Sequence, residues 1–351
     1  MTTIIHFLKA NHGDAFIIEI KDQNNNPTII VIDGGLPDTF RRYIKPIIEN
    51  YTKIDLLVLT HTDDDHIKGL VSFFESDLYK NIDIQEYWAN CRYSILLKPG
   101  NQVTLSSAKD FDKFLLQKEG EDAEEKWNKD IIFTGSSYKL NSIEFLILSP
   151  GQEQLSLFYD KWRVEEKLSE RSQAASAVVS QLEKGSIEDL AKNNFCPTRN
   201  IAEDYVNSSS IAFVMKSEDF SVLFLGDARP EIIIESLQQL GYNTINNRLK
   251  VDYVKISHHG SKNNTSPELL SFLDCNHFII STNGGSGRSK HPDREVIAWI
   301  LCRSNRENNP THLYFNYKLS KIEKKAGRFL TEDECDKFNC IIHDDVIKIP
   351  I

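Results

Sequence analysis

Residues 59–69 read Leu-Thr-His-Thr-Asp-Asp-Asp-His-Ile-Lys-Gly, and this stretch decides how the chain is interpreted. The apolar run before it, Ile54–Thr60, has the length of a buried strand, and Ile67–Phe74 has helical periodicity. Two histidines and three aspartates therefore stand between a strand and a helix. Imidazole and carboxylate are the ligands that Zn²⁺, Mn²⁺ and Fe²⁺ take in proteins. The stretch predicts a metal site that includes His61, Asp63, Asp65 and His66.

An alternative is that Asp63–Asp65 only cap the helix that begins near His66. Three adjacent carboxylates repel one another unless a cation lies among them, so the metal interpretation is preferred.

Three other apolar runs also end on an acid or a histidine, namely on Asp33, Asp227 and His258. Ligand sites of α/β sheets collect at the carboxyl ends of strands, so these side chains predict a shared rim. No histidine occurs between His66 and His258. The remaining histidines of the strand patterns and the tail are expected to be structural, hydrogen-bonded residues: His6, His277, His312 and His343.

The composition is that of a globular protein, with 351 residues, 40% hydrophobic, 26% charged and 10% aromatic. The formal net charge of −10 argues against a sequence-blind nucleic-acid coat, which needs clustered Lys and Arg. No run approaches the roughly 20 apolar residues of a membrane helix, and no secretory signal is evident. Six scattered cysteines without a CxxC pair predict reduced thiols and a cytoplasmic location, with no membrane partner.

Strands without polar alternation alternate with helices, which predicts an α/β fold whose sheets are covered by helices. Residues 85–205 differ, because charge-dense helices are expected there around short strands at Ile131–Phe133, Tyr138–Leu140 and Glu144–Leu148. We expect one domain over residues 1–351, with 85–205 as a largely helical central insertion. Its charged stretches are expected to be solvated helix faces, or alternatively a lid or an oligomerisation arm.

Six motifs together resemble the metallo-β-lactamase superfamily, and more narrowly the soluble hydrolase domain of ComEC-type competence proteins, without the membrane channel. The resemblance covers residues 3–75 and 205–300, about half of the chain. The motifs are Asn11-His12-Gly13-Asp14-Ala15, Val31-Ile32-Asp33-Gly34-Gly35, the stretch from Leu59 to Gly69, Leu223-Phe224-Leu225-Gly226-Asp227-Ala228, Ile256-Ser257-His258-His259-Gly260-Ser261 and Lys290-His291-Pro292.

The resemblance implies an αββα sandwich of two sheets with helices outside and a binuclear metal site at one edge. It implies that His61 and Asp63 bind a first metal, and that Asp65 and His66 bind a second. By the same resemblance, Asp227 bridges both metals, and His258, or less favourably His259, completes the second site. Asp33 would orient the ligand loop, and His291 would lie near the scissile group. Asp14, Asn207, Ser261 and Lys262 are expected around the site or the substrate.

The chain departs from the superfamily's pattern in its ligand set. Asp63 replaces a histidine, and the usual middle histidine is missing, its region being Asn207-Ser208-Ser209-Ser210. Both changes favour oxygen ligands, which shifts the preference from Zn²⁺ toward Mn²⁺ or Mg²⁺. Two divalent ions, Mn²⁺ or Zn²⁺ with Mg²⁺ as a further candidate, are therefore expected. His12 replaces a family glutamine and could supply an extra ligand or a proton.

The expected activity is metal-dependent hydrolysis by a metal-activated hydroxide, as a phosphodiesterase or nuclease acting on DNA, RNA or a small nucleotide. Protonation of the leaving oxygen is expected from His291 or His259, with Ser261 and Lys262 near the phosphate. The same fold also hosts lactonases, β-lactamases and thiolester hydrolases, so these remain an alternative. A further alternative is that the chain is a subunit of a multi-gene system, such as an anti-phage defence operon, and docks a protein partner or dimerises through the insertion.

Overall fold

The computed structural model describes residues 2–91, 106–128, 130–168, 185–285, 287, 289–306, 309–349 and 351. The chain divides into two compact units. Unit 1 comprises Met1–Ile131, Gln152–Ser176 and Lys348–Ile351, and unit 2 comprises Ile132–Gly151 and Ala177–Ile347.

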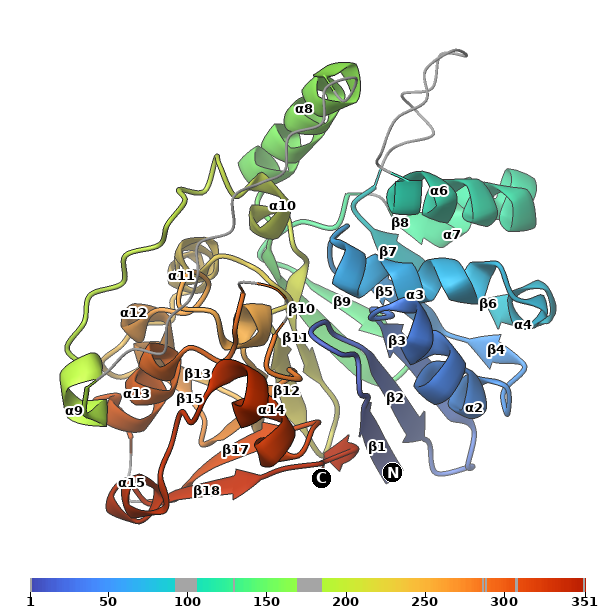
Figure 1. Ribbon diagram of the computed structural model, residues 1–351. Coiled ribbons are helices and arrows are strands. Elements are labelled where there is room, and N and C mark those ends of the chain that lie inside the picture. The colour runs from blue at the N-terminus through green and yellow to red at the C-terminus, as the bar shows by residue number, and fades with distance from the viewer. Residues whose placement is uncertain are drawn as a thin grey trace. The chain divides into compact units, whose positions relative to one another are not determined.

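Unit 1 is built on a seven-stranded mixed sheet in the order β19-β1-β2-β3-β5-β7-β8 (Figure 1). The pairs from β19 to β3 are antiparallel, and those from β3 to β8 are parallel. A small parallel pair, β4 with β6, lies in the same unit. The strands are β1 (Thr2–Phe7), β2 (Phe16–Lys21), β3 (Pro27–Ile32), β4 (Lys53–Ile54), β5 (Leu56–Leu59), β6 (Asp83–Ile84), β7 (Tyr87–Ala89), β8 (Trp127–Asn128) and β19 (Lys348–Ile349).

The helices of unit 1 follow the parallel strands. The apolar spacing of residues 38–50 predicts a helix interrupted by Pro46, and a helix forms there with a π-helical segment before the proline. Aromatic rings of these helices, among them Phe40, Phe73 and Phe111, pack into one buried group with Phe74 and Tyr79. The helices are α1 (Pro37–Thr39), η1 (Phe40–Ile44), α2 (Lys45–Ile48), α3 (Asp64–Phe74), α4 (Asp77–Asn81), α6 (Ser106–Glu119), η2 (Gly120–Asp122), α7 (Ala123–Lys126) and α8 (Gln152–Leu168).

Unit 2 has an eight-stranded mixed sheet in the order β18-β17-β16-β14-β12-β11-β10-β9. The pairs from β9 to β12 are antiparallel, and those from β12 to β18 are parallel. β11 and β12 form the hairpin that the apolar runs Ile211–Met215 and Val222–Leu225 predict. β13 pairs with β15 separately. The strands are β9 (Ser137–Leu140), β10 (Ile143–Ser149), β11 (Ala212–Lys216), β12 (Ser221–Phe224), β13 (Leu249–Lys250), β14 (Tyr253–Lys255), β15 (Leu273–Asp274), β16 (His277–Ile280), β17 (Thr311–Phe315) and β18 (Cys340–His343).

Helices pack on one face of this sheet, and their apolar residues form one buried core with alternate strand residues such as Val254, Phe278 and Leu313. Ile233, Leu269 and Ile297 contribute to that core from three different helices. The helices of unit 2 are α9 (Ile187–Leu190), α10 (Tyr205–Ser208), α11 (Pro230–Gln239), η3 (Ser257–Gly260), α12 (Pro267–Ser271), α13 (Arg294–Cys302), α14 (Leu319–Ala326) and α15 (Glu332–Lys337).

The α/β fold class predicted from the sequence is confirmed, and several local expectations are corrected. Ile131–Phe133 is not a strand, and the strand that the apolar residues of Ile341–Ile349 predict is divided between β18 and β19, which belong to different sheets. The strands expected at Tyr138–Leu140 and Glu144–Leu148 form as β9 and β10, and the interval 85–205 also contributes β7 and β8 to the sheet of unit 1. Part of its expected helical stretch, residues 169–184, lies outside the described residues.

Two further expectations concern cysteines and membrane helices. All six cysteines are thiols, and none forms a disulfide. Among the described residues, no helix combines the length and apolar character that crossing a bilayer requires.

The histidines expected to be structural include a stacked group on β16, β17 and β18 of unit 2. The ring centroids of His277 and His312 are 4.5 Å apart, and those of His312 and His343 are 5.2 Å apart. His312 Nδ1 lies 2.9 Å from His343 Nε2, and His277 Nδ1 lies 3.0 Å from the Tyr314 hydroxyl. Burial lowers the pKa of all three imidazoles. The group is therefore held in its neutral form.

This group predicts a loss of stability in acid. Because the pKa values of His277, His312 and His343 lie below their unfolded values, the unfolded chain binds more protons near pH 6. The free energy of unfolding should fall as the pH falls below about 6.5, the ordinary histidine value. His312→Phe keeps a stacked ring but removes one of these imidazoles. Urea unfolding at pH 7.5 and 5.5 should therefore show a smaller loss of unfolding free energy in this variant than in wild type. An equal loss in wild type and variant would contradict this.

Candidate metal centre

The topology brings predicted ligand residues together in pairs within each unit. In unit 1, β3 and β5 are parallel neighbours, and Asp33 and His61 follow their carboxyl ends. In unit 2, β12 and β14 are parallel neighbours, and Asp227 and His258 follow theirs. The predicted rim therefore forms within each unit, because parallel strands end at the same edge of a sheet.

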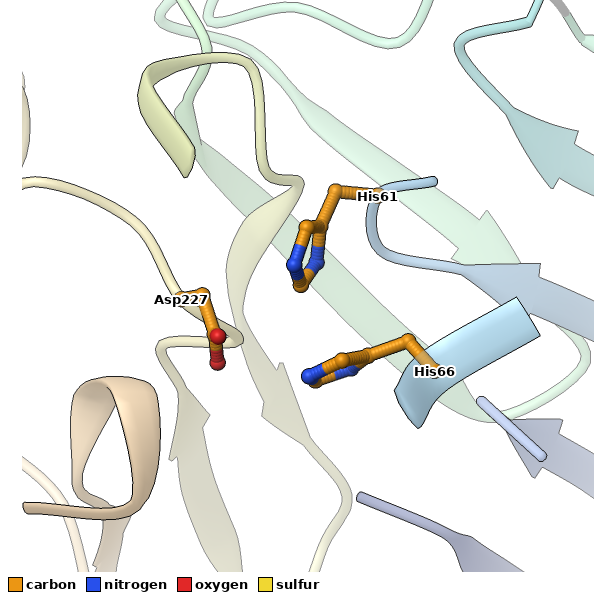
Figure 2. Close-up of side chains that lie close together, drawn as sticks. All are labelled: His61, His66 and Asp227. Carbon is orange, nitrogen blue, oxygen red and sulfur yellow. The ribbon is translucent and has the colours of Figure 1, made fainter. Parts of the chain in front are cut away.

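We call Asp33, His61, Asp63, Asp65 and His66 the N-terminal ligand cluster. Figure 2 shows the rings of His61 and His66 side by side, one from the segment after β5 and the other from the start of α3. Their centroids are 4.2 Å apart, and both residues are buried. Asp63 is more exposed, and its Oδ2 lies 3.6 Å from His61 Nε2.

Asp33 fixes the orientation of this cluster through its buried carboxylate. It accepts hydrogen bonds from the backbone N and the hydroxyl of Thr60, at 2.8 and 2.7 Å. Its Oδ2 lies 2.7 Å from His66 Nδ1, so that nitrogen carries the proton and Nε2 is the acceptor nitrogen. Thr60 donates its only hydroxyl proton to Asp33, so its oxygen accepts from His61 Nδ1 at 3.1 Å. Both imidazoles are therefore in the tautomer that binds a metal through Nε2.

Two glycines allow α3 to approach the end of β3 closely. A Cβ at Gly69 would lie 1.8 Å from the Gly34 carbonyl oxygen, so neither the helix nor the strand end could keep its place with a side chain there. The backbone confirms the approach, since Gly34 N donates to His66 O and Gly69 N donates to Gly35 O. This contact positions His66 next to Asp33.

The helix-cap alternative is wrong for Asp63. Asp63 occupies the N-cap position of α3, but its side chain makes no capping hydrogen bond. The helix begins at Asp64, three residues earlier than expected, so Asp64 and Asp65 lie in its first turn. Asp64 forms an ion pair with Lys68 on the same helix, at 2.7 Å.

The loop between β1 and β2 also approaches this cluster. The nearest ligand atoms of Asp14, Asp33 and His66 all lie within 4.8 Å of one another, and all three residues are buried. A Cβ at Gly13 would overlap the Asp65 carbonyl oxygen, so the loop touches the first turn of α3. His12 lies in the same loop and is half-buried.

We call Asp227, His258, His259 and His291 the C-terminal ligand cluster. The Asp227 side chain projects from the turn after β12, as Figure 2 shows, and is buried. Its Oδ2 lies 3.7 Å from His258 Nε2 and 3.8 Å from His259 Nε2. Lys255 Nζ donates to the Gly226 carbonyl at 3.0 Å and lies 4.0 Å from Asp227 Oδ1.

His258 and His259 are fixed by their backbone and by their Nδ1 partners. Both have positive φ, 47° and 58°, which turns the chain sharply after β14. Asn264 Oδ1 lies 2.9 Å from His258 Nδ1, and the Ser281 carbonyl lies 2.9 Å from His259 Nδ1. Asn264 also donates to the Asp227 carbonyl at 2.9 Å. Because a carbonyl oxygen only accepts, both histidines carry the proton on Nδ1 and present Nε2 as the acceptor.

The two histidines differ in exposure. The His259 side chain is 3% exposed and that of His258 is 30% exposed. Burial and a backbone acceptor are typical of a metal-ligating histidine, whereas partial exposure suits a group that meets substrate. These features favour His259 as a ligand candidate, while the preference for His258 that the resemblance implies stays a prediction.

His291 lies beside His258, with ring centroids 5.7 Å apart. Its Nδ1 is 3.4 Å from Asp293 Oδ2, and that oxygen also accepts from Lys262 N at 2.9 Å. Asp293 N donates to the Gly260 carbonyl, which connects the loop of His291 to the turn of His258.

The three remaining predicted residues of unit 2 make different contacts. Ser261 is buried and donates its backbone N to the His258 carbonyl. Lys262 forms an ion pair with the buried Glu295 at 2.6 Å, so its ammonium group faces a carboxylate. Asn207, at the end of α10, donates its amide to Asp204 Oδ1 at 3.0 Å.

Sequence reasoning missed the residues that orient the histidines, namely Thr60, Lys255, Asn264 and Ser281. Thr60 and Asn264 are polar residues within or directly beside the motifs, which is the one signal that could have found them.

Asp204 and Arg229 were also missed. Arg229 is fully buried and pairs with Asp204 at 3.2 Å. Burial raises the pKa of Asp204, although His258 and Arg229 partly oppose the rise.

Known proteins give a consistent but distant comparison. No protein-family model matches the chain. A segment of 142 residues is 27% identical to ComE operon protein 3 of Bacillus subtilis (strain 168). This segment covers 40% of this chain and 17% of that protein. The chain therefore spans a small part of that relative's length.

Similar solved structures include the metallo-β-lactamase fold protein YhfI of Bacillus subtilis, at 9% identity, full coverage of both chains and a TM-score of 0.44. Another is Tm1679, a metal-dependent hydrolase of the β-lactamase superfamily, at 11% identity and a TM-score of 0.41, covering 100% of this chain and 99% of that one. A diphosphatase from the PhnP family is 12% identical, with a TM-score of 0.38 and coverages of 96% and 82%. The descriptions of the first two name the metallo-β-lactamase fold or the β-lactamase superfamily.

The role of Asp33 can be tested by metal binding. Asp33→Asn leaves one acceptor oxygen for the donors from Thr60 and His66, so the tautomer of His66 is no longer fixed. The dissociation constant for Mn²⁺, measured by isothermal titration calorimetry, should rise about 10- to 100-fold.

The matched control is Asp55→Asn, a buried aspartate of unit 1 that accepts from Ile29 N and Lys53 Nζ. It should bind Mn²⁺ as wild type does. Wild-type affinity in Asp33→Asn would contradict the role given to Asp33.

Proposed function

We propose that this chain is a metal-dependent hydrolase of the metallo-β-lactamase type, and that its substrates are phosphodiesters. The N-terminal and C-terminal ligand clusters would each contribute to the binding of divalent cations. His61, Asp63, Asp65 and His66 would supply ligands from unit 1, and Asp227 with His259 or His258 from unit 2. The resemblance to a competence protein segment and to hydrolases, one of them a diphosphatase, supports this reaction class.

One observation carries the proposal: all four central histidines have Nδ1 on an acceptor. His61 donates to Thr60, His66 to Asp33, His258 to Asn264 and His259 to Ser281. Histidines that bind metals are oriented in this way, by an outer carboxylate or carbonyl. A core of ordinary buried histidines does not require the same tautomer at each of four positions.

The donor set also fits divalent cations chemically. Nitrogen donors from imidazole and oxygen donors from Asp63, Asp65 and Asp227 suit Mn²⁺ and Zn²⁺, and a larger share of oxygen favours Mn²⁺ or Mg²⁺. Asp227 and Asp14 are buried carboxylates, and positive charge nearby stabilises such groups. When bound, two such cations would supply a hydroxide nucleophile near neutral pH and offset the charge of the phosphate.

The residues of the chain would orient and protonate the substrate. His291 lies beside the half-exposed His258, and its Nδ1 faces the Asp293 carboxylate at 3.4 Å, so that Nε2 would donate to the leaving oxygen after protonation. His258 likewise would donate from Nε2 only when doubly protonated, but its Nδ1 faces the neutral amide of Asn264 rather than a carboxylate. Lys262 is paired with Glu295 and would need to leave it to contact a phosphate. His291 is therefore the stronger candidate for the general acid.

The activity test uses the whole chain in Mn²⁺, with single- and double-stranded DNA, RNA, a cyclic dinucleotide and bis-p-nitrophenyl phosphate. Asp227→Asn and Asp65→Asn should lower phosphodiester hydrolysis about 100-fold or more, because each removes a ligand charge from the centre. A lactone and nitrocefin are assayed in parallel.

Asp252→Asn is the control, since Asp252 is an exposed aspartate of unit 2 that accepts from Ser221. It should retain wild-type activity. Hydrolysis that persists at the wild-type rate in Asp227→Asn would overturn the metal mechanism. Turnover of the lactone or nitrocefin with none of the phosphodiesters would overturn the substrate class.

A further inference from the structure

Positive charge is concentrated on and beside α14 in unit 2, although the chain as a whole carries a formal net charge of −10. Residues 318–328 hold five Lys or Arg residues and one acid, Glu323. Burial raises the pKa of Glu323, which weakens the one opposing charge. All five cations are exposed, and we call them the basic strip: Lys318, Lys321, Lys324, Lys325 and Arg328.

The helix presents this strip because its other face is buried. Ile322 and Ala326 are buried one turn apart, and Ile322 belongs to the apolar core of unit 2. Lys321, Lys324 and Lys325 follow the same helical period on the opposite side, and all three are exposed. The packing of α14 therefore directs three ammonium groups outward from one short surface.

α14 packs directly on the glycine turn that follows β16. A Cβ at Gly284 would lie 2.5 Å from the Ile322 carbonyl oxygen and 2.9 Å from Lys325 Cβ, so a side chain there would displace the helix. Gly284 and Gly285 also have positive φ, 94° and 88°, which favours glycine at both positions. Lys325 Nζ donates to the Gly285 carbonyl at 3.3 Å. The strip is thereby fixed to this turn.

The same turn adjoins the loop of His291. A Cβ at Gly285 would lie 2.9 Å from Lys290 Cα, so the turn packs against the residue that precedes His291. Thr282, before the glycines, donates its hydroxyl to the His291 carbonyl at 3.1 Å. His291 is the candidate general acid of the proposed function. The basic strip and this histidine are therefore held by one continuous turn within unit 2.

The charges of this region indicate what it binds. Burial, together with repulsion from Lys321 and Lys290, lowers the pKa of Lys325, so these cations oppose one another in the unbound chain. A polyanion relieves such repulsion. The backbone of a polynucleotide carries a negative charge at every phosphate, and lysines bind it whatever its sequence. A small nucleotide has no further phosphates that could occupy the strip.

We propose that the basic strip binds the phosphate backbone of a polynucleotide whose scissile phosphodiester lies beside His291. This inference rests on the proposed function and narrows its substrates from phosphodiesters in general to nucleic-acid strands. The overall acidity of the chain argues against a nucleic-acid coat, but a local strip meets the need for clustered lysines. An anionic membrane would also attract these lysines, but the connection of the strip to the loop of the general acid favours the substrate.

The test combines Lys321→Gln, Lys324→Gln and Lys325→Gln in one variant of the whole chain. Fluorescence anisotropy in EDTA, where metal-dependent hydrolysis cannot proceed, measures the binding of labelled single-stranded and duplex DNA. The dissociation constant should be at least about tenfold higher than in wild type for the form that the strip binds. The slope of its logarithm against log salt should be smaller by about 2, since each lost phosphate contact removes nearly one unit.

Two further variants separate local charge from net charge and from packing. Replacing the same three lysines by arginine keeps the charge and should keep the affinity for DNA. The matched control combines Lys192→Gln, Lys216→Gln and Lys250→Gln, which removes three charges from exposed lysines elsewhere in unit 2. It should bind DNA as wild type does. Circular dichroism and thermal unfolding show whether each variant folds as wild type does.

Three results would overturn the proposal. The first is an equal loss of DNA affinity in the two glutamine variants, because net charge would then explain it. The second is a wild-type chain that binds neither DNA form. The third is binding to phosphatidylserine vesicles that depends on the strip while DNA binding does not, which would assign the strip to a membrane.

Hydrolysis assays in Mn²⁺ distinguish this inference from the proposed function. If wild type hydrolyses bis-p-nitrophenyl phosphate and the glutamine variant of the strip binds DNA as wild type does, only this inference fails. If wild type binds DNA through the strip but hydrolyses no phosphodiester, the proposed function fails and the strip stands as a nucleic-acid binding surface.

Discussion

The buried contact between Asp33 and His66 is the interaction on which the account depends. Asp33 follows β3, His66 lies on α3, and the glycines at positions 34 and 69 allow the two elements to meet. The same carboxylate accepts both hydrogen bonds from Thr60, which then fixes His61. One carboxylate therefore sets the ring orientation and the tautomer of two histidines. Without it, these rings would be ordinary buried imidazoles with no defined metal-binding nitrogen.

Unit 2 reaches a similar result with neutral acceptors. Asn264 connects His258 to the Asp227 backbone, and the Ser281 carbonyl fixes His259. In both units the ligand residues follow the carboxyl ends of neighbouring parallel strands, and the residues that orient them lie one layer behind. Acceptor atoms are therefore concentrated on short turns. Side-chain hydrogen bonds stabilise these turns, which main-chain hydrogen bonds alone would not do.

The sequence predicted the parts of this arrangement that are local. Apolar runs gave β3, β5 and β12, and the residues directly after them gave Asp33, His61 and Asp227. The acids at 63–65 could have been helix caps by spacing alone, and only the absence of a capping bond at Asp63 decided the question. The roles carried over from the family for individual ligands remain predictions.

Other features depend on residues distant in sequence, and a single sequence could not show them. Asp204 and Arg229 are 25 residues apart and meet only after β11 and β12 have paired. The tail looked like one strand, but β18 and β19 join different sheets. α14 and α15 were missed because their surfaces are mostly polar. The relative exposure of His258 and His259 also required the folded chain, since the two residues are adjacent and chemically identical.

A crystal structure with Mn²⁺, with anomalous diffraction recorded at the manganese edge, tests the central claim most directly. The account predicts anomalous peaks at both ligand clusters, with His61 and His66 among the ligands at one and Asp227 with His259 or His258 at the other. The absence of a peak at either cluster would contradict it.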